Sequence, residues 1–277
     1  MIFSASYPKL WKFLLDHRRS LPRANFAYEV HGLVEINPDP TPEKIAREIE
    51  LFKRTDILWT TTDILREFLA RHGIKSAHLP YGCPMHPDDF PDKTVEGELP
   101  AEDFRLGYFG SVYPEQGVDW LVEKWQPTWG RLYIAGGTYA GENVISYGRV
   151  PHKTITDDLL PNVDALVIPA LRMGRTPYVY FTKAYDYLAF RRPIIASNLP
   201  SIAEVLRDGQ EALLFEPGDE KSFLAALEKI RTDGVLRARL INNCIARAKE
   251  LSYEKSVKHF WELVDAPHCE GAKGKVS

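Results

Sequence analysis

The sequence predicts an α/β protein with two Rossmann-like, doubly wound domains, of which the N-terminal one is incomplete. From Asn25 onward, short apolar strands alternate with amphipathic helices, the pattern of parallel sheets built from βαβ units. A proline-rich and acidic stretch between Cys83 and Asp103 interrupts this alternation once and is typical of a linker. The 277 residues are enough for two modest domains.

These observations divide the chain into five parts. We expect a truncated N-terminal Rossmann-like domain at 1–90, a linker at 91–104, a second Rossmann-like domain at 105–250, a C-terminal helix at 251–266 and a disordered tail at 267–277.

The first domain is predicted to hold about three βα units. Met1, Ile2 and Phe3 indicate the end of a strand, which a helix over 9–17 follows. The segments FAYEVH, DILWTT and AHLPYG are predicted strands. Thr41 and Pro42 favour a helix start, and the helices between these strands are expected at 42–53 and 63–72.

The second domain is predicted to be more complete. Its expected strands are RLGYFGS, LYIAGG, NVISYGRV, DALVIPA, PIIASN and EALLFEP. Helices are expected at 119–125, 154–160, 182–190, 201–207 and 219–231, with two more at 235–251 and 254–264. This alternation predicts a doubly wound sheet.

Composition limits the classes of protein that this chain can be. A hydrophobic content of 44% and a net charge of −3 are typical of a globular protein and argue against a dedicated nucleic-acid binder. The three cysteines, Cys83, Cys244 and Cys269, are widely spaced, which predicts reduced thiols without a disulfide and a cytoplasmic location. No signal peptide and no apolar run of the ~18 residues that a membrane span needs are found.

Two strand-to-helix turns are candidates for binding phosphate. Gly110 to Gly117 has glycine at both ends and hydroxyl and amide side chains between, so it could cradle a phosphate or form a tight turn, and we weigh these alternatives equally. Gly136 and Gly137 favour a structural turn. Neither loop has the G-x-G-x-x-G fingerprint, which argues against a nicotinamide or flavin oxidoreductase.

The stretch from Pro169 to Pro193 is the most informative. It places Arg172, Arg175, Lys183 and Asp186 between a strand and its next helix, where cations and a helix N-terminus together suit a diphosphate. Asp186 could accept hydrogen bonds from a ribose. Arg191 and Arg192 at the helix end are predicted to be solvent-exposed or C-cap charges.

The ordered set of motifs resembles the family 4 retaining glycosyltransferases of the GT-B fold over nearly the entire chain. YEVHGL resembles the first-domain strand that ends in histidine, LGYFGSVYPEQGVDWLV the donor-phosphate loop, and YGRV the turn near the nucleobase. The most specific match is VDALVIPA followed by TKAYDYLAFRRPIIASNLPSIAEVLRDGQEALLFEPGD. LSYEKSVKHFWELV resembles the helix that crosses back to the first domain.

The resemblance implies roles for individual residues. His31 would hydrogen-bond a hydroxyl of the donor sugar, and Asp186 stands where the family has the second Glu of its Glu, seven residues, Glu motif, which binds the ribose. These two are the predicted catalytic residues. The implied donor-binding set is Gly110, Ser111, Gln116, Gly117, Gly136, Arg149, Val150, Arg172, Arg175, Tyr178, Phe181, Thr182, Lys183 and Asp186.

Three departures from the family pattern are visible. Ser111 and Gln116 stand where the family has Arg and Lys in its phosphate loop, so Arg172, Arg175 or Lys183 would have to compensate. Tyr178 replaces the first Glu of the seven-spaced pair. The chain also begins after the strands that usually carry the acceptor loop.

We therefore predict a retaining, hexosyltransferase-like glycosyltransferase of class EC 2.4, with a nucleotide-sugar donor, an unknown acceptor, and no metal or other cofactor. The alternative is a catalytically silent GT-B module that binds a nucleotide, or a subunit whose first domain another chain completes; a homo-oligomer, an epimerase and a phosphorylase stay open. Lys9 to Phe13, with Arg18 and Arg19, predicts either a helix covering the first sheet, which we favour, or peripheral membrane contact.

Overall fold

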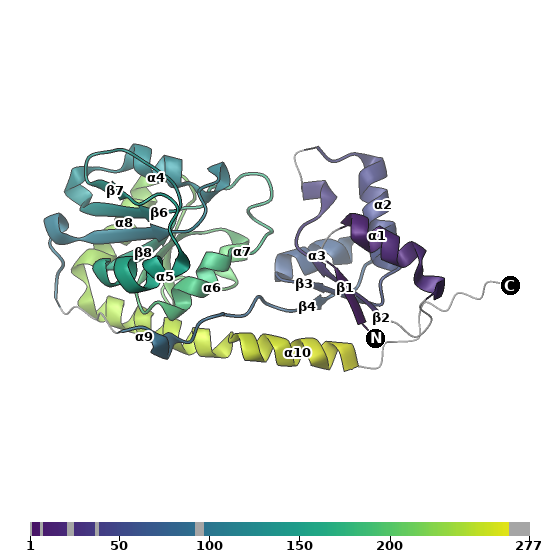
Figure 1. Ribbon diagram of the computed structural model, residues 1–277. Coiled ribbons are helices and arrows are strands. Elements are labelled where there is room, and N and C mark those ends of the chain that lie inside the picture. The colour runs from purple at the N-terminus through teal and green to yellow at the C-terminus, as the bar shows by residue number, and fades with distance from the viewer. Residues whose placement is uncertain (1, 6–7, 21–24, 37–38, 92–96, 266–277) are drawn as a thin grey trace. The chain divides into compact units, whose positions relative to one another are not determined.

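The computed structural model describes residues 2–5, 8–20, 25–36, 39–91 and 97–265. The chain forms two compact units (Figure 1). The first comprises the chain up to Tyr81, the short segment Tyr178–Tyr180 and the chain from Glu254 onward, whereas the second comprises Gly82–Pro177 and Phe181–Tyr253. The expected tail at 267–277 lies outside the described residues.

The first unit is built on a parallel sheet of four described strands. They follow one another in chain order as β1 (Ile2–Ala5), β2 (Asn25–Val30), β3 (Ile57–Thr60) and β4 (Ala77–His78). The helices between them are α1 (Pro8–Asp16), α2 (Pro42–Lys53) and α3 (Asp63–Arg71). The last strand is shorter than the predicted AHLPYG, because Pro80 has no N–H with which to continue the ladder.

Both faces of this sheet are covered. On β2, Phe26, Tyr28 and Val30 point into one core with residues of α1, α2 and α3. Ala27 points to the opposite face, where the C-terminal helix α10 (Tyr253–Asp265) packs. Its Phe260 lies edge-on to Trp59, with 5.4 Å between the ring centroids. Strand alternation thus gives the sheet two apolar faces, each with its own helical cover.

Side-chain caps fix the starts of two helices in the first unit. Thr41 accepts the N–H of Lys44 at 3.3 Å, as the sequence predicts for the start of α2. Thr62 does the same for Leu65 at 3.4 Å at the start of α3, and it is fully buried.

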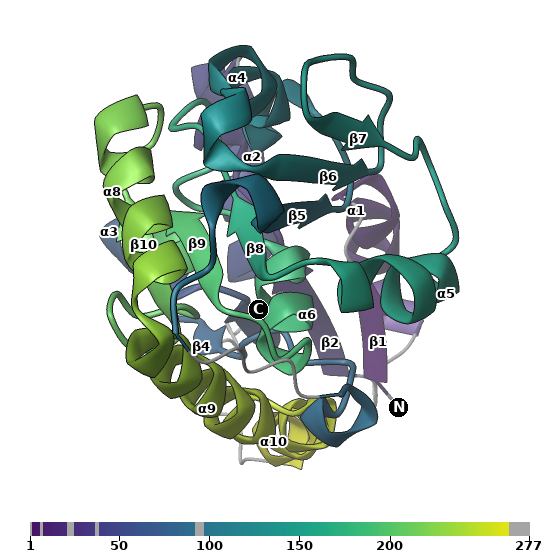
Figure 2. The same ribbon diagram turned by 90° about the vertical axis from the view of Figure 1, so that its left-hand side faces the viewer.

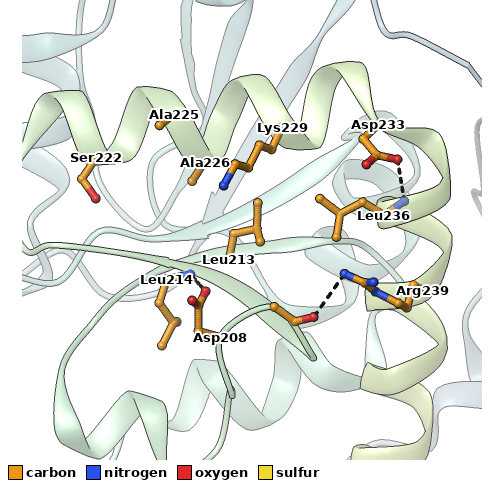
Figure 3. Close-up of a pocket in the computed structure, with 11 residues that line it drawn as sticks. Asp208, Leu213, Leu214, Ser222, Ala225, Ala226, Lys229, Asp233, Leu236 and Arg239 are labelled. Carbon is orange, nitrogen blue, oxygen red and sulfur yellow. Dashed lines mark hydrogen bonds between the residues drawn. The ribbon is translucent and has the colours of Figure 1, made fainter.

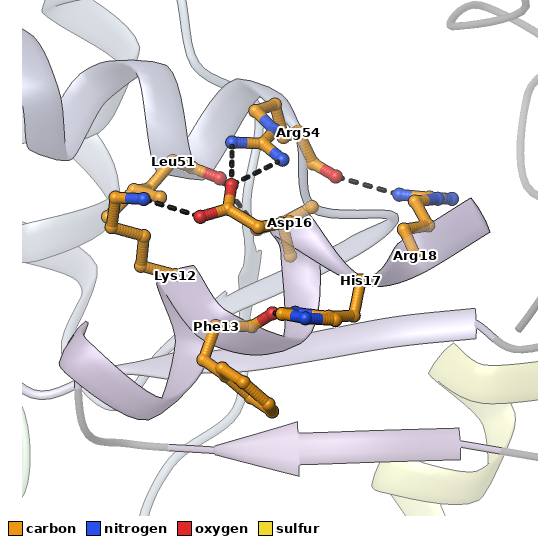
Figure 4. A network of polar contacts seen from close by, with 8 residues as sticks. Lys12, Phe13, Asp16, His17, Arg18, Leu51 and Arg54 are labelled. Carbon is orange, nitrogen blue, oxygen red and sulfur yellow. Dashed lines mark hydrogen bonds and ion pairs between the residues drawn. The ribbon is translucent and has the colours of Figure 1, made fainter. Parts of the chain in front are cut away.

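Surface ion pairs join α1 to the end of α2 (Figure 4). Asp16 pairs with Lys12 and accepts both terminal nitrogens of Arg54 at 3.2 Å. Arg18 donates to the carbonyl of Arg54 at 2.8 Å and pairs with Asp56. The hydrogen bonds of Lys12 and Arg54 lower the pKa of Asp16. Because these groups are largely exposed, the pairs add little to stability.

The second unit is built on a parallel sheet whose strand order reverses at its centre. The order is β10-β9-β8-β5-β6-β7. The strands are β5 (Arg105–Phe109), β6 (Arg131–Ala135), β7 (Val144–Ser146), β8 (Ala165–Ile168), β9 (Ile194–Ser197) and β10 (Ala212–Phe215). The chain runs outward from β5 in one direction and from β8 in the other, so the switch point lies between β5 and β8. Ligands bind at the carboxyl ends of strands at such a point.

Helices cover both faces of the second sheet (Figure 2). α4 (Val118–Lys124) and α8 (Glu220–Thr232) pack on one face, and α5 (His152–Thr154) and α6 (Thr182–Ala189) lie on the other. α9 (Gly234–Glu250) packs beside α6. The predicted helix at 201–207 is instead the single turn α7 (Pro200–Ala203). The one at 154–160 is a composite of α5, a π-helical turn at Ile155–Leu159 and a 3-10 turn at Leu160–Asn162.

The prediction for Arg192 is wrong. Its side chain is not an exposed charge at the end of α6, because only 1% of the residue is accessible. The guanidinium donates to the carbonyls of Val163 at 3.1 Å, Leu160 at 3.2 Å and Pro91 at 3.3 Å. Five N–H donors in a planar group can satisfy several carbonyls at once, so Arg192 joins three segments of the second unit.

The two cysteines in the described part of the chain, Cys83 and Cys244, are buried free thiols. Over the same residues, no helix is both long and apolar enough to cross a bilayer.

Candidate functional site

Three loops meet at the carboxyl edge of the second sheet, at the switch point. The N–H of Gly110, after β5, donates to Ala135 at the end of β6, with 2.9 Å between nitrogen and oxygen. The N–H of Gly136 donates to Gly148 at 2.6 Å. The loop after β8 is tied to the same place, because the N–H of Leu171 donates to the carbonyl of Glu115 at 3.0 Å.

Glycine is required at two of these turns because backbone packs directly on backbone. A Cβ on Gly117 would lie 1.9 Å from the carbonyl oxygen of Pro169, and one on Gly136 would lie 1.8 Å from that of Gly110. Both residues also have positive φ, +71° and +132°. These glycines therefore bring the three loops together, which makes the structural and the binding interpretations of the Gly110 to Gly117 loop compatible.

A cavity of about 340 Å³ opens at this edge of the sheet. Five of the predicted donor-binding residues line it: Gly110, Ser111, Gly136, Arg149 and Val150. Its other walls come from Val112, Tyr113, Ala135 and Ile155. The structure thus brings together the phosphate loop and the YGRV turn, which are about forty residues apart in the sequence.

Lys183 lies beside the phosphate loop and not on the surface. It is the second residue of α6, and only 8% of it is accessible. Its ammonium donates to the hydroxyl of Tyr108 at 2.7 Å and to the side-chain oxygen of Gln116, and it lies 4.6 Å from the centre of the Tyr108 ring. Burial lowers the pKa of Lys183 to about 7, against a smaller raising effect of Asp186. The ammonium of Lys183, on α6, thus lies beside position 116, where the family pattern has a cation in the loop itself.

The N-terminus of α6 faces the same region without a side-chain cap. Phe181, the N-cap residue, is buried and has no side-chain oxygen to accept an N–H from the first turn. Tyr187, further along α6, fixes the helix to β5, since its hydroxyl accepts the N–H of Phe109 at 2.8 Å and donates to the carbonyl of Phe109 at 3.1 Å. Thr182, at the first helical position, is exposed.

Asp186 lies one turn after Lys183 and is half-buried. Burial raises the pKa of its carboxyl to about 6, while the nearby His152 and Lys183 act in the opposite direction. At neutral pH this carboxyl group is mainly ionised but only partly hydrated, so hydrogen bonds from hydroxyl groups would stabilise its charge. Such a group is suited to accept hydrogen bonds from a ribose.

The remaining predicted residues of the loop after β8 do not line the cavity. Arg172 is exposed and donates to the carbonyl of Asn198 at 3.2 Å, and Arg175 is exposed. Tyr178 packs within the first unit, where its carbonyl accepts the hydroxyl of Thr62 at 2.8 Å. Of the three cations expected to compensate for Ser111 and Gln116, only Lys183 contacts the phosphate loop.

His31 follows β2 in the first unit. Its Nε2 lies 3.6 Å from Oε2 of Glu29, and its ring lies 5.8 Å from that of Tyr180. Tyr180 in turn stacks on Tyr81, with 5.2 Å between centroids. The strand-end position agrees with the sequence, but its surroundings come from segments far apart in the chain.

Sequence reasoning missed three residues at these sites: Tyr108, Tyr187 and Glu29. Tyr108 is fully buried under the phosphate loop and donates to the carbonyl of Ser111. Tyr108 and Tyr187 look like ordinary core residues in apolar segments, so no local signal marks them. Glu29 had a signal, because it is an acidic residue inside an otherwise apolar strand.

A second hollow of the same unit, about 430 Å³, contains none of the predicted residues (Figure 3). It lies between β10, α8 and α9. Two of its carboxylates accept backbone N–H groups: Asp208 accepts that of Leu214 and Asp233 that of Leu236, both at 2.8 Å. In the described part of the chain, no group of three or more histidine, cysteine or acidic side chains is arranged to hold a metal.

Comparison with known proteins finds a family model that matches the second unit over most of its length. Residues 103–233 match the model of the family described as Glycosyl transferases group 1. The uncharacterized glycosyltransferase MJ1178 of Methanocaldococcus jannaschii is 24% identical over 179 residues, which cover 59% of this chain and 50% of that protein. The chain thus spans about half the length of the curated relative that it matches.

Solved structures of glycosyltransferases have the same fold. HepE of Anabaena in complex with UDP superimposes with a TM-score of 0.77 at 13% identity, over 96% of this chain and 79% of that one. Sucrose-phosphate synthase of Thermosynechococcus elongatus gives a TM-score of 0.74 at 17% identity, over 95% and 72%. The fold is therefore GT-B, as the sequence predicts.

Proposed function

We propose that this chain, whose residues 103–233 match the model of the Glycosyl transferases group 1 family, is a retaining glycosyltransferase that uses a nucleotide-diphosphate sugar. The observation that carries the proposal is the position of Lys183. Its ammonium contacts Gln116 in the loop after β5, where the resemblance expects the donor phosphates and where the usual loop cation is absent.

The cavity at the carboxyl edge of the second sheet fits the nucleotide of such a donor. We assign the diphosphate to the Gly110 to Gly117 loop, the first turn of α6 and Lys183, since backbone N–H groups and an ammonium favour negative charge. Arg149 and Val150 line the same cavity and would face the base. Asp186 would accept hydrogen bonds from the ribose hydroxyls.

The chemistry that this arrangement supports is electrostatic. As the bond from the anomeric carbon to the phosphate oxygen breaks, the sugar becomes cationic and the diphosphate gains charge, which Lys183 and the helix N-terminus stabilise. The leaving phosphate oxygen takes the proton of the acceptor hydroxyl as that hydroxyl attacks on the same face, which retains the anomeric configuration. We assign His31 a hydrogen bond to a sugar hydroxyl, and the scheme requires no metal. We propose that the protein acts in the cytoplasm.

Titration calorimetry with UDP, GDP and ADP tests the binding step. We expect one of these nucleotides to bind, and Lys183→Met to weaken that binding about 100-fold, since a hydrogen bond to a charged group is worth roughly 1.5–3 kcal/mol. Lys153→Met is the matched control, because Lys153 is an exposed lysine of the same unit that pairs with Asp157. Equal affinities in both variants would exclude the proposed role of Lys183.

A transfer assay then separates the enzyme from its alternative. UDP-glucose is the first donor to test, because the solved structure of Anabaena HepE holds it. Product that keeps the anomeric configuration supports the transferase. Nucleotide binding without transfer or donor hydrolysis supports the silent GT-B module, which the uncharged side chains of Ser111 and Gln116 and the absence of a carboxylate at Tyr178 favour.

A further inference from the structure

The surroundings of His31 contain a carboxylate that the family resemblance does not assign. Glu29 lies two residues before His31, so strand alternation puts the two side chains on the same face. The atoms closest to each other are Oε2 of Glu29 and Nε2 of His31, 3.6 Å apart. The pair therefore forms through the backbone geometry of β2 and the residue that follows it.

The position of Glu29 is unfavourable for a carboxylate unless it has a partner. Its neighbour on the same face of β2 is Ala27, which is fully buried, and its partner across the sheet is Trp59, also buried. The Glu29 side chain itself is 28% accessible. Burial raises its pKa, and His31 lowers it. An apolar residue here would cost less free energy, so the carboxylate points to a role other than stability.

An aromatic ring also neighbours the imidazole. The Tyr180 ring lies 5.8 Å from that of His31, tilted by 37°, and it stacks on Tyr81 with 5.2 Å between ring centroids. Tyr180 belongs to the short segment that packs in the first unit, and burial together with Glu29 and Tyr81 raises its pKa. The titratable groups around Glu29 are thus His31, Tyr180 and, beyond it, Tyr81.

We propose that Glu29 is a positioning residue for His31: its carboxylate and the ring of Tyr180 fix the imidazole so that Nδ1 stays available to a hydroxyl of the donor sugar. The carboxylate lies 3.6 Å from Nε2 and attracts that side of the ring electrostatically, and Tyr180 restricts rotation of the ring. This role rests on the proposed function, because it presumes that His31 contacts the sugar. Glu29 acts through His31 and does not touch the substrate.

The pair itself can be tested without any activity. Carbon-detected NMR follows the titration of the Glu29 carboxyl in the wild type and in His31→Asn. Because His31 lowers the pKa of Glu29, its removal is expected to raise the titration midpoint of that carboxyl. His72→Asn is the matched control, since His72 forms a pair of its own with Glu35 at 2.9 Å in the same unit. A Glu29 midpoint that does not respond to His31→Asn would overturn the proposal.

Kinetics then test the positioning role. We expect Glu29→Met to lower kcat for transfer tenfold or more without changing the affinity for the free nucleotide, and Glu29→Gln, which keeps an acceptor, to recover part of the loss. In His31→Asn, adding Glu29→Met is expected to cost nothing further, because the two residues act as one unit. Glu35→Gln is the control. Additive losses would overturn the proposal, whereas a wild type without transfer would count against the proposed function and leave the NMR result to decide the pairing.

Discussion

The two units are built from the same kind of βα element, yet they differ in where side chains converge. In the second, strand order reverses between β5 and β8, and loops from both halves meet at one edge of the sheet. In the first, the four described strands follow chain order, and His31 follows β2 beside residues brought in from elsewhere in the chain. The difference teaches that a reversal of strand order gathers distant loops of one sheet into a cavity, whereas the aromatic neighbours of His31 come from segments that do not belong to its sheet.

We expect the largest effect from a substitution that separates the loops after β5 and β6 in the second unit. In Gly136→Ala the new Cβ would lie 1.8 Å from the carbonyl oxygen of Gly110. Since backbone cannot yield cheaply, we expect nucleotide affinity to fall more than 100-fold and stability to drop by about 3 kcal/mol or more. Calorimetry and urea unfolding measure both. Gly174 also has a positive φ, but a Cβ added there would have no heavy atom within 4 Å. Gly174→Ala should therefore lower the free energy of unfolding by only ~1 kcal/mol. Equal losses in the two variants would contradict this account.

The pH dependence of nucleotide binding tests whether Asp186 and Lys183 of the second unit both contribute. The pKa of Asp186 is about 6, so its carboxylate forms above that pH, and the pKa of Lys183 is about 7, so its ammonium is lost above that pH. Affinity should therefore be highest between about 6 and 7 and fall by up to ~10-fold per pH unit on either side. Asp186→Asn should remove the acid limb alone. A flat profile from pH 5 to 9 in the wild type would show that neither group contributes.

The buried ammonium of Lys183 is expected to favour nucleotide binding while it lowers the free energy of unfolding. Because burial lowers the pKa of Lys183 from 10.5 to about 7, the folded chain holds fewer protons than the unfolded chain between these values. The penalty is thus complete below about pH 7 and fades as pH rises towards 10.5. We expect Lys183→Met to raise the free energy of unfolding by ~1–3 kcal/mol at pH 6 while it weakens nucleotide binding. A loss of stability at pH 6 would be the opposite result.

In the first unit, the smallest of these effects concerns the segment Tyr178–Tyr180. Thr62 donates its hydroxyl to the carbonyl of Tyr178 at 2.8 Å and caps α3 through the N–H of Leu65. Thr62→Val keeps the shape and removes both bonds, so we expect a loss of ~1–2 kcal/mol in urea unfolding, with nucleotide affinity unchanged. Thr62→Ser should retain most of the stability. If the two variants unfold alike, the hydroxyl has no structural role.

Much of the candidate site could be predicted from sequence because it is encoded locally. Strand ends, tight turns and a helix start can be predicted from the conformations that individual residues allow. The residues that give these signals are the glycines at 110, 117 and 136 and the stretch from Pro169 to Asp219. The sequence does not distinguish Arg172 and Arg175 from Lys183, since all three are cations on the same stretch. Local pattern has no means of ranking them.

The sequence by itself determined the alternation of strands and helices, the cap at Thr41, and the placing of the Gly110 to Gly117 loop at a strand end. Only the tertiary structure decided which charges are used. Lys183 reaches Tyr108 and Gln116 across 75 and 67 residues, Arg192 is buried among carbonyls, and Glu29 and Tyr180 lie beside His31. The physical reason is that turns and caps depend on neighbours within a few residues, whereas burial and charge pairing depend on contacts that exist only once the sheets have formed.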